Sequence, residues 1–187
     1  KAVNLILDLA ENGVSVKSIY LNIFQAVQQE LGRLWHINEI NVAEEHFCTS
    51  VTQLAMAQLY PYILSNKEDK VTCITTCVGD ELHELGIRMI ADLLEMEGYN
   101  TIHLGANTPD KSILSKIEKE NASFLGISAT LPLHTRKAEE LIKKVKSKIS
   151  EINIMVGGYV FNNSPGLWEE IGADGFAPDA DKAVEVT

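Results

Sequence analysis

The chain has 187 residues, of which 45% are apolar and 22% charged, so it can bury a core without disulfide bridges. Its 16 basic and 26 acidic residues give a formal charge of −10, which argues against binding nucleic-acid phosphates or an anionic membrane surface. No apolar run approaches the ~20 residues that span a bilayer, and the three cysteines are few and odd in number. We therefore expect a cytoplasmic protein with no membrane contact.

The first third of the chain has helical periodicity. An apolar stripe ends at Gly13, which is a suitable residue for the end of a first helix. Further on, Asn41 and Glu44 have the spacing of a capping box, which predicts the start of a long helix. A short helical piece is expected to begin at Pro61 and end near residues 65–66. Helices with such short links predict a helical bundle over residues 1–66.

After residue 66, short β-branched runs alternate with helical runs. The predicted strands are Val71–Cys77, Thr101–Leu104, Phe124–Ser128, Ile152–Val156 and Gly175–Phe176, and the predicted helices are 84–97, 109–120, 133–148 and 165–171. This alternation predicts right-handed βαβ units and a five-stranded parallel sheet. Residues 70–187 should therefore form a flavodoxin-like (Rossmann-like) α/β domain, in which ligands bind at the carboxyl ends of the strands.

Three small motifs follow the predicted strands. Glu81-Leu82-His83-Glu84-Leu85-Gly86 follows the first strand, Ser128-Ala129-Thr130 ends the third, and Gly157-Gly158 follows the fourth. Glu81 could accept a proton from one nitrogen of His83, which would leave the other nitrogen as a metal ligand. Gly86 would let a bulky ligand approach the backbone, and the glycine pair would leave room for a flat group beside the hydroxyls of Ser128 and Thr130. By itself the first motif is also compatible with a surface loop and a solvated histidine.

The order and spacing of these motifs resemble the cobalamin-binding domain family, whose pattern is D/E-x-H-x-x-G, then S-x-T or S-x-L, then GG. The resemblance implies that His83 is the lower axial ligand of cobalt and replaces the cofactor's own dimethylbenzimidazole. It further implies that the nucleotide tail enters a slot lined by the serine, threonine and glycine residues.

A second pattern lies in the predicted bundle, where eight residues separate the pair Trp35-His36 from the pair Glu45-His46. An indole is a good cover for a flat ligand. The pattern resembles the W-H…E-H motif of CarH-type light-sensing regulators of the MerR family. That resemblance implies that Trp35 packs on the adenosyl group of adenosylcobalamin, that Glu45 hydrogen-bonds it and that His46 lies beside the upper face. His36 would bind cobalt after light removes that group.

The resemblance implies a light-sensing module without catalytic residues, which binds adenosylcobalamin base-off and His-on. Photolysis of the Co–C bond would change its conformation or oligomeric state and regulate transcription. The implied partners are a second copy of the chain and DNA, the latter bound only through a region before Lys1. The main alternative is a corrinoid carrier protein of a methyltransferase system. A mutase-type cobalamin subunit and a sensor with a second chromophore such as a bilin also stay open.

Two further histidines have less specific surroundings. His103 lies at the end of the second predicted strand, and we expect a structural or solvated role for it. His134 opens a basic helix, where a helix N-terminus and solvent would satisfy the imidazole.

Overall fold

The computed structural model describes residues 1–63 and 71–185. The chain divides into two compact units, Lys1–Asn66 and Lys67–Thr187, each of which is described by itself. Among the described residues, none of the helices combines the length and the apolar character that a membrane crossing requires.

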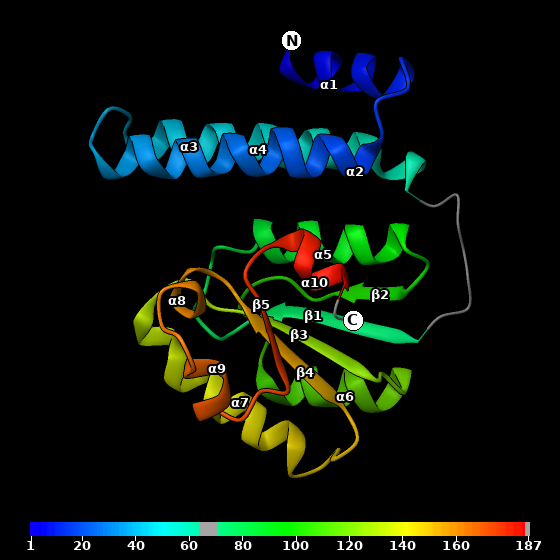
Figure 1. Ribbon diagram of the computed structural model, residues 1–187, viewed down its shortest axis with the longest axis vertical. Helices are drawn as coiled ribbons and strands as arrows, with labels where there is room; N and C mark the ends of the chain where they lie inside the picture. The colour runs from blue at the N-terminus through cyan, green and yellow to red at the C-terminus, as the bar shows by residue number, and fades with distance from the viewer. Residues whose placement is uncertain (64–70, 186–187) are drawn as a thin grey trace. The chain divides into compact units, whose positions relative to one another are not determined.

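The first unit is helical, as the periodicity predicts (Figure 1). Its elements are α1 (Ala2–Glu11), α2 (Val16–Ile19), a π-helical turn (Tyr20–Phe24), α3 (Gln25–His36), α4 (Val42–Leu59) and a 3-10 turn (Tyr60–Tyr62). The α2, π-helical and α3 segments follow one another without a break, and α4 packs against both α1 and α3. The rings of Tyr20 and Phe24 lie 5.3 Å apart between their centroids in the core of this unit. The expected end of the last helical piece, near residues 65–66, lies outside the described residues.

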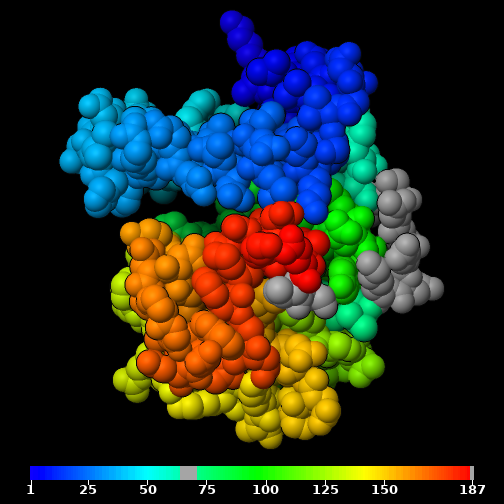
Figure 2. Space-filling view, in the orientation of Figure 1, coloured from blue at the N-terminus to red at the C-terminus, as the bar shows by residue number. Residues whose placement is uncertain are grey.

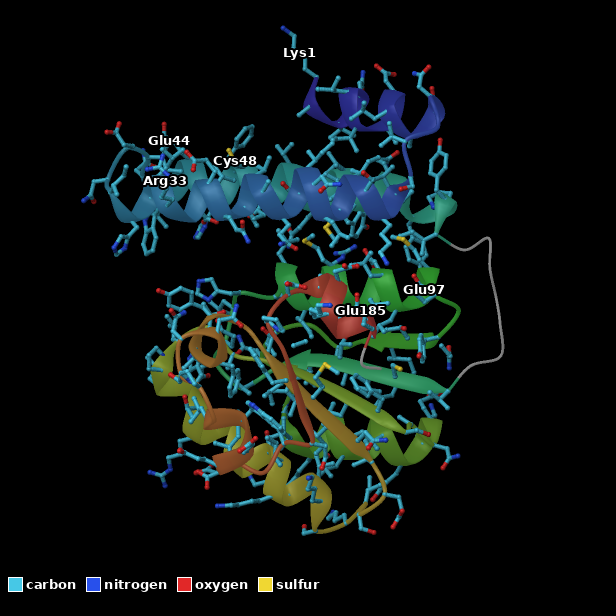
Figure 3. The ribbon with its side chains drawn as sticks, viewed as in Figure 1. Lys1, Arg33, Glu44, Cys48, Glu97 and Glu185 are labelled. Atoms are coloured by element: carbon cyan, nitrogen blue, oxygen red, sulfur yellow. The ribbon has the colours of Figure 1, made fainter. Side chains whose placement is uncertain are left out.

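Both predicted helix boundaries of this unit are present in the structure. Gly13 follows α1 with a φ of +88°, a conformation that glycine adopts without steric cost. At the start of α4, the side chain of Asn41 accepts hydrogen bonds from the backbone N–H groups of Ala43 and Glu44 at 2.9 and 3.1 Å. The Glu44 carboxylate accepts the N–H of Asn41 in return at 2.8 Å, which completes the capping box. Figure 3 shows Glu44 at this turn, near Arg33 of α3.

The second unit contains the predicted five-stranded parallel sheet. Its strands are β1 (Thr72–Cys77), β2 (Asn100–His103), β3 (Phe124–Ser128), β4 (Asn153–Gly157) and β5 (Gly175–Ala177), in the order β2-β1-β3-β4-β5. This is the flavodoxin-like order, and the chain changes direction across the sheet between β1 and β3. The predicted fold class is thus confirmed.

Helices cover both faces of this sheet (Figure 1). They are α5 (Leu85–Met96), α6 (Asp110–Glu120), a 3-10 turn (Pro132–His134), α7 (Thr135–Lys146), α8 (Tyr159–Asn162), α9 (Leu167–Glu170) and α10 (Ala180–Glu185). On one face α6 and α7 bury a large aliphatic core against the strands, and on the other α5 and α10 form a smaller cluster around Cys73 and Leu94. In Figure 2 the orange-to-red segment from α8 to α10 forms a continuous part of the surface of this unit. The short helices α8 and α10 have no counterpart among the predicted elements.

Candidate cobalamin site

The strand register brings the three motifs of the sheet unit together. Cys77 at the end of β1 pairs with Ser128 at the end of β3, and Ser128 pairs with Gly157 at the end of β4. The ladder continues beyond the strands, because Val78 N–H donates to Ser128 O at 3.2 Å and Ala129 N–H donates to Gly157 O at 3.1 Å. The loops that carry Glu81 and Thr130 therefore leave the same edge of the sheet, at the switch point.

The carboxylate of Glu81 is the centre of this edge. It is fully buried, and each of its oxygens accepts two hydrogen bonds. Oε1 accepts the backbone N–H of His83 at 3.1 Å and lies 2.5 Å from His83 Nδ1. Oε2 accepts the backbone N–H of Thr130 at 2.6 Å and lies 2.9 Å from His134 Nδ1. One side chain thus joins the loop after β1 to the loop after β3.

The surroundings of Glu81 keep it ionised. Burial by itself would raise the pKa of the carboxyl, but the hydrogen bonds from His134, Thr130 and His83 outweigh that effect and lower the pKa to about 2. A carboxylate only accepts hydrogen bonds, so both imidazoles must carry their proton on Nδ1. In its neutral form His83 is therefore held in the tautomer that leaves a lone pair on Nε2, which is the form needed to bind a metal.

The side chain of His83 is open to a ligand, since 61% of it is exposed although its carboxylate partner is buried. A Cβ placed on Gly86, in the first turn of α5, would meet no heavy atom within 4 Å. The neighbouring side chains of Leu82 and Leu133 are apolar and more than 60% exposed. An oriented imidazole, open space and exposed leucines together fit a large, mostly apolar ligand with a metal centre, such as a corrinoid.

The glycine pair has a different surrounding from the one expected. A Cβ on Gly158, whose φ is +103°, would lie 2.4 Å from Ala129 O and 3.2 Å from Ser128 Oγ, and a Cβ on Gly157 would lie 3.1 Å from Ala177 O. The glycines therefore allow close packing of backbone between neighbouring strand ends, and the space beside them is filled by this chain itself. At Gly158 the neighbour is the loop after β3, which packs directly against the start of α8.

The two histidines with less specific surroundings behave differently. His134 is only 3% exposed and bonds to Glu81, so the expected solvated position at a helix start is wrong. The 3-10 turn before α7 points this side chain inward, toward the buried carboxylate. His103 lies at the end of β2 with Nδ1 3.0 Å from Thr75 Oγ1, and burial lowers its pKa. Its role is structural, as the sequence indicates.

The residues of the second pattern share one end of the helical unit, where α3 turns into α4. Trp35 and His36 end α3 and are exposed, and Glu45 and His46 lie in the first turns of α4. Glu45 Oε2 is 2.5 Å from His46 Nδ1, and its other oxygen is 2.8 Å from Thr49 Oγ1. The helical unit thus presents an exposed indole beside two exposed imidazoles, one of them oriented by a carboxylate.

Two family models match the chain, both described as a B12 binding domain. One covers residues 71–186 and the other covers residues 1–60. The chain belongs to the B12 binding domain family. This membership agrees with the oriented imidazole of His83 and establishes cobalamin as the ligand class of the chain.

The relatives of this B12-binding protein are corrinoid proteins. A corrinoid protein of Desulfitobacterium hafniense is 29% identical over all of this chain and 85% of its own length. The dimethylamine corrinoid protein of Methanosarcina barkeri is 26% identical over 84% of this chain and 72% of its own length, whereas only half of dimethylamine corrinoid protein 2 of Methanosarcina mazei is matched. The solved monomethylamine corrinoid protein of Methanosarcina barkeri has a TM-score of 0.86 at 22% identity, over 98% of this chain and 87% of that chain, and supports the fold.

These relatives overturn the expected function. They are named as corrinoid proteins, two of them as dimethylamine corrinoid proteins, so the interpretation as a light sensor that regulates transcription is wrong. The expected DNA partner and homo-oligomer find no support among them. The Trp-His and Glu-His pairs do not decide the function, because they indicate only that this end of the bundle carries an aromatic ring and two imidazoles, one of them oriented by a carboxylate. They do not specify which upper ligand those groups would meet.

Proposed function

We propose that this chain is the corrinoid carrier protein of a methyltransferase system, with His83 as the lower axial ligand of cobalamin. The observation that carries the proposal is the contact between the buried Glu81 carboxylate and Nδ1 of the exposed His83 imidazole. Support comes from the dimethylamine corrinoid proteins among its relatives. Bound cobalamin supplies a cobalt that accepts a methyl group and gives it up again.

The residues of this chain would bind and orient the cofactor. His83 Nε2 would occupy the lower axial position, and the cofactor's own base cannot then occupy it, so the cofactor would be bound base-off. Glu81 would orient the imidazole and make its Nε2 a stronger donor to the metal. Gly86 leaves open space beside the first turn of α5 for the corrin. The nucleotide tail of the cofactor would lie beside the ends of β3 and β4. These strand ends are kept in place by Ser128, Thr130, Gly157 and Gly158.

The helical unit, residues 1–66, would cover the upper face. Trp35 offers an exposed indole for apolar contact, and Glu45 orients His46 as Glu81 orients His83. The methyl group must pass between the cobalt and the substrate of a methyltransferase partner. The upper cover must therefore also let that partner reach the cobalt. We infer that the cofactor cycles through its methyl form, and that the partner is a protein whose substrate is a methylated amine or a related methyl donor.

Cobalt ligation is tested first. The protein is labelled with nitrogen-15, reconstituted with hydroxocobalamin and reduced to the cobalt(II) form, and its EPR spectrum is compared with that of unlabelled protein. If the axial nitrogen comes from the protein, the label converts each triplet of the superhyperfine pattern into a doublet. His83→Ala should abolish this change. His103→Ala, which removes a half-buried imidazole from the neighbouring strand end, leaves the pattern as it is. A pattern that never responds to the label refutes the proposed ligation.

Methyl transfer is tested second. The loaded protein is reduced further, to the cobalt(I) form, and is mixed with a monomethylamine or dimethylamine methyltransferase and its substrate. Formation of bound methylcobalamin is followed by absorption. Methylation that needs both the enzyme and the substrate supports a carrier. Tight His83 ligation with no methylation by any methylamine or methanol methyltransferase would overturn the carrier function and leave only cofactor binding.

A further inference from the structure

We propose that His134 is a positioning residue for cobalt ligation, which acts on His83 through the carboxylate of Glu81. This rests on the proposed function, because it concerns the imidazole that would bind cobalt. Through its hydrogen bond to Oε2, His134 holds the carboxylate in the orientation that keeps the proton of His83 on Nδ1 and its lone pair on Nε2.

The hydrogen bonds of Glu81 leave it no freedom to turn. A carboxylate has about four lone-pair directions, and here all of them face donors. A protonated carboxyl group would fit these distances only if it donated to the Nδ1 atom of an imidazole in its other tautomer, whereas an ionised Glu81 accepts from all four groups. With a fixed backbone N–H donor on each oxygen, the geometry favours an ionised Glu81 and two Nδ1–H imidazoles. Removing the imidazole of His134 leaves Oε2 with one donor and allows the carboxylate to rotate away from His83.

The burial of His134 indicates that this contact is not incidental. The imidazole is 3% exposed, and it comes from the loop after β3, 53 residues away from Glu81 along the chain. Burying a polar ring is unfavourable unless it is hydrogen-bonded, and the partner it has is the same carboxylate that orients His83. Thr130, in the same loop, donates its backbone N–H to the same oxygen. The loop after β3 is thus built to support the ligand loop after β1.

A second link between the same two segments provides a matched control. Lys137, one turn into α7, forms an ion pair with Asp80, the residue before Glu81. This pair is exposed to solvent and does not touch the Glu81 carboxylate. Exposed ion pairs contribute little to stability, because solvent screens them. If His134 served only to attach the loop after β1 to α7, Lys137→Gln should have a similar effect. If His134 orients the Glu81 carboxylate, Lys137→Gln should leave that orientation unchanged.

The test compares His134→Asn with His134→Leu, which have nearly the same shape and differ in whether they carry a donor. The amide nitrogen of asparagine lies close to the position of Nδ1 and can donate to Glu81. Three quantities are measured: the nitrogen-15 NMR shifts of the His83 ring without cofactor, the fraction of His-on cobalt(II) by EPR, and the affinity for hydroxocobalamin. Partners of a metal-binding histidine typically change metal affinity by roughly 10–100-fold.

We expect His134→Leu to shift the His83 ring toward the Nε2–H tautomer, to lower the His-on fraction and to weaken cobalamin binding by about tenfold. His134→Asn and Lys137→Gln should stay near the unmodified protein in all three measurements. The proposal is overturned if His134→Leu leaves the tautomer and the His-on fraction unchanged, or if His134→Asn loses as much as His134→Leu. Should His134→Leu fail to fold, His134→Phe replaces it with a ring that has no donor.

The proposed function fails in a different way. If the unmodified protein shows no nitrogen coupling from His83, the ligation itself is absent before any change at His134 is made. If the coupling is present and only the His134 variants behave unexpectedly, cobalt ligation stands and the positioning role falls.

Discussion

Replacing Glu81 by glutamine should destabilise the folded sheet unit, and the effect should depend on pH. Glutamine keeps the size of the side chain, but one of its two terminal atoms becomes an NH2 group. Each carboxylate oxygen of Glu81 now accepts two N–H donors, so the amide nitrogen must face two of them whichever way it points. The variant loses the charge and two acceptor contacts at a site that is fully buried.

The pKa of Glu81 gives the size of the effect. Folding lowers this pKa from 4.5 to about 2, and each unit of difference corresponds to about 1.4 kcal/mol. The ionised carboxylate therefore contributes about 3 kcal/mol to the free energy of unfolding at neutral pH. Because the folded pKa is the lower one, this stability is fully present above pH 4.5 and is lost as the pH falls toward 2. At pH 3 roughly 1 kcal/mol of it should be left.

Urea unfolding at a series of pH values measures this difference. Trp168 packs against the core of the sheet unit, so its fluorescence reports that unit in a Trp35→Phe background. Glu81→Gln is compared with Glu120→Gln, which makes the same chemical change at a partly exposed ion pair with Lys116 and should have a much smaller effect. A stability difference for Glu81→Gln that is the same at pH 7 and pH 3, or larger at pH 3, would show that the carboxylate is not held ionised as argued.

Three further predictions concern other parts of the chain. Gly158→Ala should cost about 3 kcal/mol, because its φ of +103° is strained for alanine and the new Cβ would overlap the neighbouring backbone; urea unfolding measures it. Asn41→Ala should cost about 1 kcal/mol in the helical unit, because the capping box is lost, and thermal unfolding followed by circular dichroism measures it. Burial raises the pKa of Cys73 and Cys77 to about 12, so in native protein at pH 8 a thiol reagent should react only with Cys48.

Each of these has a control within the chain. Gly175→Ala should be tolerated far better than Gly158→Ala, because nothing lies within 4 Å of a Cβ there, and equal losses would contradict the close approach. Asn41→Ser should restore most of the capping energy, and a serine variant as unstable as alanine would argue against the cap. All three thiols should react in urea, and three fast thiols in the native protein would contradict their burial.

Much of the fold can be predicted from local sequence. Strand positions follow from β-branched runs, and the capping box at Asn41 marks the start of α4 within one residue. The short helices α8 and α10 were missed because four to six residues are too few to show a helical period. At the glycine pair the sequence shows that side chains are missing, but it does not show which backbone groups approach there.

The contact between Glu81 and His83 is a local one, two residues apart, and the sequence was sufficient to predict it. The contact with His134 spans 53 residues, and no spacing rule connects the two positions. A signal was nevertheless present. Once Cys77 and Ser128 are expected to end neighbouring parallel strands, the residues after both strands must meet at one edge, and His134 lies only six residues after Ser128. A carboxylate buried beside one imidazole has a second oxygen to satisfy, and the loop after the neighbouring strand β3 is a nearby source of donors in the predicted topology.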